Sequence, residues 1–356
     1  MKSLKRSRSK LANQRGAAVI IVAVSMLTLL GFAAIAVDTG YLMVAKNELQ
    51  NIADASALAA TRQLGVIYEP MTYSEQQNYT ADPGTIIPVA KNVAQLNKAA
   101  GDIVTIQDSD VVIGRWNSET HILTPTLDQP NAVKVTARRD NSINGPVTTF
   151  FAKILGIDTA DVAADAIAAL TGQSTAGPGG LDIPVGISDK WFEPGFCNQP
   201  IKFYPTGSME GCAGWHTFTS WPANASKLTT IMEEMTPAVP TFESPEAVAG
   251  QKPFVFSGGN VASAFDEMSA LYEAKKDPVT GRWETVVVVY ESSDCSNPTG
   301  NITVRGFATA IITGVNGPGD DPAHTIFAEV KCDNVEFGRG SGGNYGTMGS
   351  IPGLVE

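Results

Sequence analysis

The stretch from Ala17 to Val37 contains no charged residue, and it constrains this chain more than any other feature. A helix of these 21 residues is about 31 Å long at a rise of about 1.5 Å per residue, which matches the hydrocarbon core of a bilayer. The sequence therefore predicts one transmembrane helix, residues 17–37.

The charges on either side of this stretch predict its orientation. Six basic residues and no acidic residue precede it, and the first charge after it is Asp38. Positive charge marks the cytoplasmic end of a transmembrane helix. We therefore expect a basic cytoplasmic tail, residues 1–16, and the bulk of the chain on the other side of the membrane.

A cleavable secretory signal is the competing interpretation, because Ala34-Ile35-Ala36 has the small-x-small form that signal peptidase accepts. The apolar stretch is longer than the 7–15 residues usual for a signal peptide, and the helical pattern continues past the cleavage point. These two features favour a retained anchor.

A second helical segment, residues 38–64, is predicted directly after the apolar stretch. It contains no proline, and small or apolar side chains recur every three or four residues, at Ala45, Leu49, Ile52, Ser56 and Ala59 or Ala60. Ala53 and Ala57 flank this stripe. Small residues let a second helix approach closely, but the same spacing is expected if the stripe packs on the chain's own globular part.

Several motifs in fixed order resemble the TadG-like proteins of Flp (tight adherence) pilus assembly. They are Arg15-Gly16, Val37-Asp38-x-Gly40, Gln50 and 54–60 (DASALAA), followed by Ile113-Gly114-x-Trp116, 131–139 (NAVKVTARR) and 150–156 (FFAKILG). The resemblance covers about residues 15 to 171. It implies a non-enzymatic accessory protein, anchored in the bacterial inner membrane with its bulk in the periplasm, that binds pilus-assembly membrane proteins through the transmembrane and juxtamembrane helix. The helix-contact candidates are Asp38, Gly40, Gln50, Ala53, Asp54 and Ala57.

One position departs from the prepilin pattern. Prepilins are cut after a glycine that precedes the apolar run and usually carry Glu five residues beyond it; here Gly16 is present, but the later position is Ile21. This departure counts against processing as a prepilin, and a minor pilin-like subunit built into the fibre is the alternative function rather than the preferred one.

The remainder of the chain predicts an α+β fold in two small mixed domains. The first, residues 65–171, is expected to hold a helix at 88–99 that Gly101 stops, and strands at 103–106, 111–114 and 131–139. The Ala-rich run 162–170 fits either a strand or a helix. Residues 172–181 have the Gly, Ser and Pro content of a linker.

The second domain, residues 182–356, opens with eight aromatic residues between Trp191 and Trp221, which we expect to form core. Predicted helices cover 226–235 and 260–276, and predicted strands cover 286–290, 301–312 and 325–331. The Gly-rich C-terminus is open to two interpretations, a flexible tail or closely packed backbone.

Cysteine usage fits an exported chain. All four cysteines, Cys197, Cys212, Cys295 and Cys332, lie in the second domain, and an even number in an exported chain predicts disulfides. The sequence-local pairing, Cys197 with Cys212 and Cys295 with Cys332, is preferred. A zinc site on Cys197, Cys212 and His216 is the rival, but no CxxC or HxxxH spacing supports it.

The sequence predicts neither catalysis nor a cofactor. It contains only three histidines and none of the GxSxG, HExxH or phosphate-loop motifs. Without the N-terminal tail, 19 Lys and Arg stand against 36 Asp and Glu, so nucleic acid is not an expected partner, and membrane lipid is expected only at the anchor. A secreted enzyme with an unrecognised site in the second half is the remaining alternative.

Overall fold

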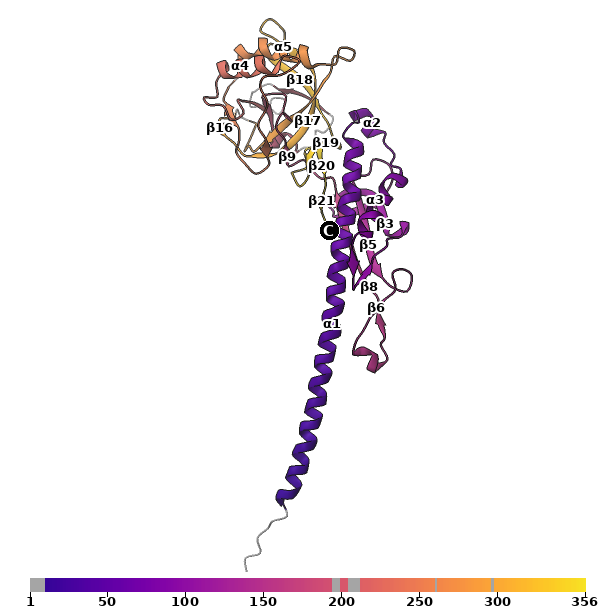
Figure 1. Ribbon diagram of the computed structural model, residues 1–356. Coiled ribbons are helices and arrows are strands. Elements are labelled where there is room, and N and C mark those ends of the chain that lie inside the picture. Colours follow the sequence, from indigo (N-terminus) through magenta and orange to yellow (C-terminus); the bar gives the residue numbers. More distant parts are fainter. Residues whose placement is uncertain (1–9, 194–198, 204–211, 260, 296–297) are drawn as a thin grey trace, which may run out of the picture. The chain divides into compact units, whose positions relative to one another are not determined.

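A computed structural model describes residues 10–193, 199–203, 212–259, 261–295 and 298–356, with side chains from residue 17 onward (Figure 1). The chain divides into two compact units. One comprises the residues up to Ser56 with 90–111 and 135–166, and the other comprises 57–89, 112–134 and 167–356. The structure confirms a mixed α+β chain that begins with a long apolar helix.

Helix α1 runs without interruption from Lys10 to Tyr68, 59 residues in all (Figure 1). It contains no proline, and the first proline of the chain, Pro70, follows its end. Its N-terminal part is long and apolar enough to cross a membrane, and none of that apolar window is buried inside the protein. The apolar stretch and the segment predicted after it are therefore one helix.

The first unit places short strands and turns around the middle of α1. Its elements are the end of α3 (Pro83–Gln95), β1 (Lys98–Ala99), β2 (Asp102–Ile103), η1 (Asp108–Asp110), most of β5 (Ala132–Arg139), β6 (Val147–Thr148), η2 (Ala152–Leu155), β7 (Thr159–Ala160) and the start of β8 (Val162–Ala169). Its buried apolar side chains are mostly Ala and Val, with Leu49, Ile52 and Ile106 as the largest. This core is thin, which suits a helix lying on a sheet.

The helix predicted at 88–99 is wrong in its bounds, because α3 covers Pro83–Gln95. Asp82 begins it: its side chain accepts the N–H of Gly84 at 2.8 Å, and Pro83 occupies the first helical position. Gly101 does not stop this helix. Ala100 and Gly101 have φ values of +48° and +87° and form the two-residue turn between β1 and β2.

Two of the strands predicted in the first half are confirmed with changed bounds. Residues 111–114 lie in β3 (Val111–Asn117), which pairs with β4 (Ile122–Pro125), and residues 131–139 lie in β5. The ambiguous run 162–170 is strand β8. Only Ile103 of the strand predicted at 103–106 is in a strand, β2.

An eight-stranded sheet forms the main body of the second unit, in the order β11-β18-β17-β15-β10-β12-β14-β16. Neighbouring strands are antiparallel except β10 and β15. The strand bounds are β10 (Val185–Ser188), β11 (Pro200–Phe203), β12 (Ala213–His216), β14 (Val255–Ser257), β15 (Trp283–Tyr290), β16 (Gly300–Asn301), β17 (Val304–Asn316) and β18 (Thr325–Val330). Helices α4 (Ala225–Met235) and α5 (Phe265–Lys275) lie together against this sheet (Figure 1).

The predicted elements of the second half are largely confirmed. Helix α4 begins after Asn224, whose side chain caps it, and α5 begins at Phe265, preceded by η5 (Ala262–Ala264); the predicted starting residue Asn260 lies outside the described residues. The central strand β15 has four consecutive fully buried residues, Val287 to Tyr290, because both faces of the sheet are covered.

Aromatic residues form the core here, as expected. Trp191, Phe203, Trp215 and Phe218 are all at most 3% exposed, whereas Trp221 is 70% exposed. Phe196 and Tyr204 of the same run lie outside the described residues.

The Gly-rich C-terminus is packed backbone, not a flexible tail. It forms β19 (Asn334–Arg339), β20 (Thr347–Ile351) and β21 (Gly353–Leu354); β19 and β20 pair in parallel, and β21 pairs with β8. A Cβ on Gly342 would collide with the carbonyl oxygen of Gln173, so glycine is required for this approach. Within the predicted linker, β9 (Thr175–Ala176) pairs with β13 (Ala247–Val248).

The preferred disulfide pairing is wrong, because Cys212 is bonded to Cys295. Strand β10 lies between β12 and β15, antiparallel to the first and parallel to the second. The start of β12 and the end of β15 therefore lie close together, at the same end of their strands as the C-terminal end of β10. Cys212 directly precedes β12, and Cys295 follows β15. Sheet topology, not sequence distance, selects the pair. Cys197 lies outside the described residues.

Candidate functional site

The first charged residue after the apolar segment, Asp38, is bound to the backbone of a distant loop. Its carboxylate accepts the N–H groups of Phe150 at 2.7 Å, Phe151 at 3.0 Å and Ala152 at 2.6 Å. The Tyr41 ring, one turn further along α1, contacts the Phe150 ring edge to face at a centroid distance of 5.0 Å. Asp38 is only 6% exposed. We call this arrangement the Asp38 clasp.

The electrostatics of the clasp favour an ionised carboxylate. Burial raises the pKa of Asp38, but the three backbone N–H groups lower it by more, and the nearby charge of Lys153 lowers it further, so the net pKa is below its usual value. Charge-assisted hydrogen bonds of this kind are stronger than neutral ones. The clasp is therefore a fixed structural joint at physiological pH.

Further contacts fasten α1 to the first unit above the clasp. The Gln50 side chain donates to the backbone oxygen of Asp165 in β8 at 3.0 Å and to the Asp54 carboxylate at 2.8 Å. Glu48 accepts the N–H of Ala100 at 2.7 Å. These bonds fasten the helix to β8 and to the turn that follows β1.

The structure resolves the two interpretations of the small-residue stripe. Ala45, Leu49, Ala53 and Ala57 are all 0% exposed, so the stripe packs on the chain's own globular part. Ala53 and Ala57 are covered within this chain and offer no surface to a partner helix. Asp38, Gln50 and Asp54 are likewise engaged in contacts within the chain.

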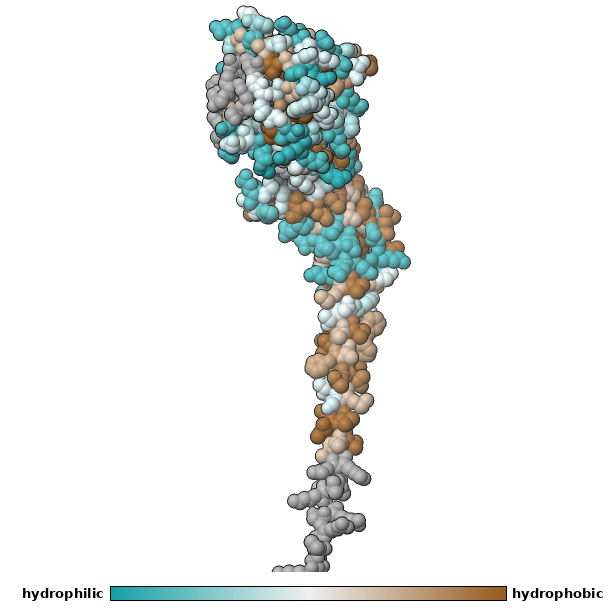
Figure 2. Space-filling model, turned by 90° about the vertical axis from the view of Figure 1, so that its left-hand side faces the viewer, coloured by the Kyte–Doolittle hydropathy of each residue, from teal (hydrophilic) through white to brown (hydrophobic). Residues whose placement is uncertain are grey.

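The opposite face of α1 is open. A Cβ placed on Gly40 meets no atom within 4 Å, and Met43 and Val44 are 64% and 53% exposed. Asn47 is also exposed. Since these positions recur at three and four residues, they form one stripe, which we call the outer face; it continues the exposed apolar surface of residues 17–37 (Figure 2).

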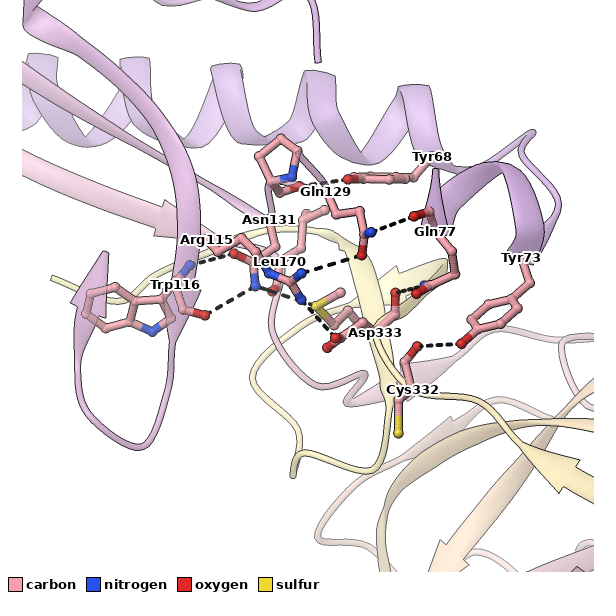
Figure 3. A network of polar contacts seen from close by, with 12 residues as sticks. Tyr68, Tyr73, Gln77, Arg115, Trp116, Gln129, Asn131, Leu170, Cys332 and Asp333 are labelled. Carbon is pink, nitrogen blue, oxygen red and sulfur yellow. Dashed lines mark hydrogen bonds and ion pairs between the residues drawn. The ribbon is translucent and has the colours of Figure 1, made fainter. Parts of the chain in front are cut away.

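A polar network lies in the second unit (Figure 3). Arg115 of β3 pairs with Asp333 at 2.8 Å and donates to Gln129 at 3.4 Å, and Gln129 donates to the backbone oxygen of Gln77 at 2.5 Å. Tyr73 of α2 (Tyr73–Gln77) donates to the carbonyl of Cys332 at 3.2 Å. These bonds join the turn before β19 to β3 and α2.

A cavity of about 550 Å³ opens beside this network. Arg115, Glu119, Asn131 and Asn344 contribute polar groups to its wall, and Trp116 and Met348 contribute apolar surface. The described residues that line it include neither histidine nor cysteine. Asn131 is already committed to the backbone of Trp116, accepting its N–H at 2.7 Å.

The residues considered for zinc are accounted for otherwise. Cys212 is in the disulfide, and His216 is fully buried among Phe218, Phe254 and Phe256, with ring centroids 4.6, 4.9 and 5.4 Å away. Burial lowers the pKa of His216 to about 3, so it is neutral. Its role is that of a core residue.

The sequence could not reveal what Asp38 binds. Its partner loop lies 112 residues away, and it bonds to backbone groups, which carry no sequence signal. The sequence does not identify the outer face either. Only the burial of the small-residue stripe on the opposite side of α1 distinguishes the two faces, and that burial is known from the structure alone.

Two family models match the chain. Residues 16–63 match a family described as Flp pilus-assembly TadE/G-like, and residues 45–168 match one described as Tad-like Flp pilus-assembly. Together the two matches contain α1 from Gly16 onward, the clasp and its loop. No curated protein and no solved structure matches the chain.

Proposed function

Residues 16–168 make this chain a member of the TadG-like Flp pilus-assembly family, and from this premise we propose that it is a membrane-anchored accessory component that acts by binding other assembly proteins. The proposed role is non-enzymatic, in keeping with a family of assembly components.

One observation carries this proposal: a single unbroken helix leads from the apolar segment into the folded first unit. The clasp fixes the loop at 150–152 to the first charged residue after that segment. An exported domain mounted in this way has no hinge at its base, so it stands at a fixed height over the bilayer. That is a suitable geometry for presenting a binding surface beside a membrane-embedded machine.

The proposed location is the bacterial inner membrane, with the N-terminus in the cytoplasm and the bulk of the chain in the periplasm. The basic N-terminal residues and the acidic remainder support this orientation. The Cys212–Cys295 disulfide supports it further, since disulfides persist in oxidising compartments.

The proposed contact surface is the outer face together with the side of residues 17–37 that lies in line with it. Helices associate in and near membranes through small residues that allow close approach, and Gly40 has open space where a side chain would be. The exposed Met43 and Val44 next to it supply apolar contact. The partner that fits is a transmembrane helix of another pilus-assembly protein.

Co-purification of the tagged full-length chain from detergent extracts tests this function. Pilus-assembly membrane proteins should co-purify with the native chain, and deletion of the gene should reduce pili on the cell surface. A normal number of pili in the deletion strain, with no assembly protein recovered, would overturn the proposal.

The contact surface has a matched pair of variants. Gly40→Leu fills the outer face, whereas Gly31→Leu places the same side chain nine residues away, two and a half turns along and so on the opposite side of the helix. Both leave the fold intact, because neither Cβ meets an atom within 4 Å. Gly40→Leu should reduce co-purified partner at least several-fold and Gly31→Leu should not; equal recovery contradicts the surface.

The alternative of a pilin-like subunit is favoured by Gly16, which directly precedes the apolar segment. N-terminal sequencing of the protein decides between the two. A mature chain that begins at Ala17 and is found in sheared fibres supports the subunit, and an uncut chain found in membranes supports the anchor.

A further inference from the structure

The loop at the tip of the β6–β7 hairpin exposes large apolar side chains in an unusual concentration. Five of the eight residues from 150 to 157 are large apolar residues with at least 43% of their surface exposed. They are Phe150 at 56%, Phe151 at 43%, Ile154 at 82%, Leu155 at 73% and Ile157 at 53%. We call these residues the apolar tip. Single exposed apolar residues are common on protein surfaces, but a contiguous cluster of them marks a surface that contacts a membrane or another molecule.

The apolar tip is held rigidly. Strands β6 and β7 pair at its base, and the Thr149 hydroxyl donates to the backbone oxygen of Ile157 at 2.5 Å. The N–H of Ile157 donates to the backbone oxygen of Ala152 at 3.0 Å, and Gly156, with φ of +81°, ends the short helix η2. The exposure is therefore built into the fold.

The Asp38 clasp determines where this loop lies along α1. Asp38 follows Val37, the last residue of the apolar segment, by one position, a rise of about 1.5 Å. Its carboxylate contacts the backbone of Phe150, Phe151 and Ala152 directly. The apolar tip is thus fixed at the level where α1 leaves the hydrocarbon core.

We propose that the apolar tip inserts into the headgroup region of the same bilayer that α1 spans, as a second, monotopic membrane contact. This inference depends on the proposed function in one respect, that residues 17–37 cross a membrane. Lipid is the expected binding partner of the apolar tip, because the membrane surface lies at this level of α1. In addition, the exposed apolar surface of the tip continues that of the helix.

The charge pattern of the loop suits this position. Lys153 is exposed between the apolar side chains, where its long stem can lie along them while its ammonium group reaches lipid phosphates. Asp158 follows the last apolar residue of the tip and is exposed at the base of the hairpin. Two membrane contacts on the first unit restrict how far that unit can tilt or rotate over the bilayer.

Lipid contact can be measured on the full chain in vesicles. The purified chain is reconstituted in phosphatidylethanolamine and phosphatidylglycerol vesicles whose acyl chains carry bromine. An environment-sensitive fluorophore is attached to Ile154→Cys without reductant, so that the Cys212–Cys295 bond stays closed. Bromine should quench this label at least threefold more than the same label on Leu96→Cys.

Leu96 is a matched control, because it is 84% exposed and belongs to the same unit. It lies near β1, and Ala100 in the following turn is bonded to Glu48, ten residues beyond Asp38 and so about 15 Å further along the helix. Equal quenching at the two positions would overturn the inference.

Carbonate extraction of the same vesicles separates the two proposals. If the chain is washed out, α1 does not span the membrane and the proposed function fails; if it is retained and the two labels are quenched equally, only the apolar tip is refuted. In the Ile154→Asp, Leu155→Asp double variant, quenching of a label on Ile157→Cys should fall to the level of the control. An unchanged signal there also overturns the inference.

Discussion

The buried His216 makes a quantitative prediction about the pH dependence of stability. It is 0% exposed, its ring stacks on Phe254, and Nδ1 accepts the N–H of Phe218 at 3.4 Å. Burial among these apolar rings disfavours the charged imidazolium, so the pKa of His216 in the folded chain is about 3, against 6.5 in the unfolded chain. The folded state therefore binds fewer protons than the unfolded state between these two values.

The sign follows from linkage. The contribution of neutral His216 to the free energy of unfolding is fully present above pH 6.5. It is lost progressively as the pH falls from there toward 3, because only the unfolded chain gains the proton. With these two pKa values, the unfolding free energy at pH 5 is about 2 kcal/mol lower than at pH 7.5, and at pH 4 it is about 3 kcal/mol lower.

Urea unfolding of the full chain in detergent, followed by tryptophan fluorescence, measures this loss. All five tryptophans belong to the unit that contains His216. A loss of about 2 kcal/mol lowers the urea midpoint by about 1 M at a typical slope of about 2 kcal/mol per M. The matched variant is His216→Phe, which keeps an aromatic ring among the three phenylalanines and removes the titrating group.

The replacement of His216 by Phe changes the free energy of unfolding by an amount that does not depend on pH. The comparison therefore concerns only how the free energy of unfolding changes with pH in each protein. Carboxyl groups that titrate in the same range contribute equally to both proteins and cancel. If the native chain and the variant lose the same stability between pH 7.5 and pH 5, the assignment of His216 as a neutral buried residue is refuted.

Three further predictions concern single contacts. Cys212→Ser with Cys295→Ser opens a loop with a sequence separation of 83 residues and should cost between about 4 and 5 kcal/mol in the chain-entropy model, measured by urea unfolding. Gly346→Ala should destabilise by more than about 1 kcal/mol, since this residue has φ of +86° and an added Cβ collides with backbone; an unchanged midpoint contradicts the packed C-terminus. Asp38→Asn should raise amide hydrogen exchange at 150–152 at least tenfold while the exchange of β15 stays as in the native chain, and protected amides at 150–152 would show that the clasp is dispensable.

Much of the candidate site could be located from the sequence, but not its contacts. The motif around Asp38 and the run at 150–156 are both recognisable as pieces of a family pattern. That they bind each other depends on a carboxylate meeting backbone N–H groups, and every residue except proline has such a group. Only the structure shows that the large apolar side chains of the run at 150–156 are exposed.

The sequence by itself determined the elements that depend on local physics. The absence of charge over residues 17–37 and the absence of proline up to Pro70 are sufficient for one long helix, and β-branched runs are sufficient for the central strands. The tertiary structure decided which surfaces face each other. It covered Ala53 and Ala57, left Gly40 open, and paired Cys212 with Cys295, because burial and pairing depend on which distant segments the sheet brings together, and sequence spacing carries no information about that.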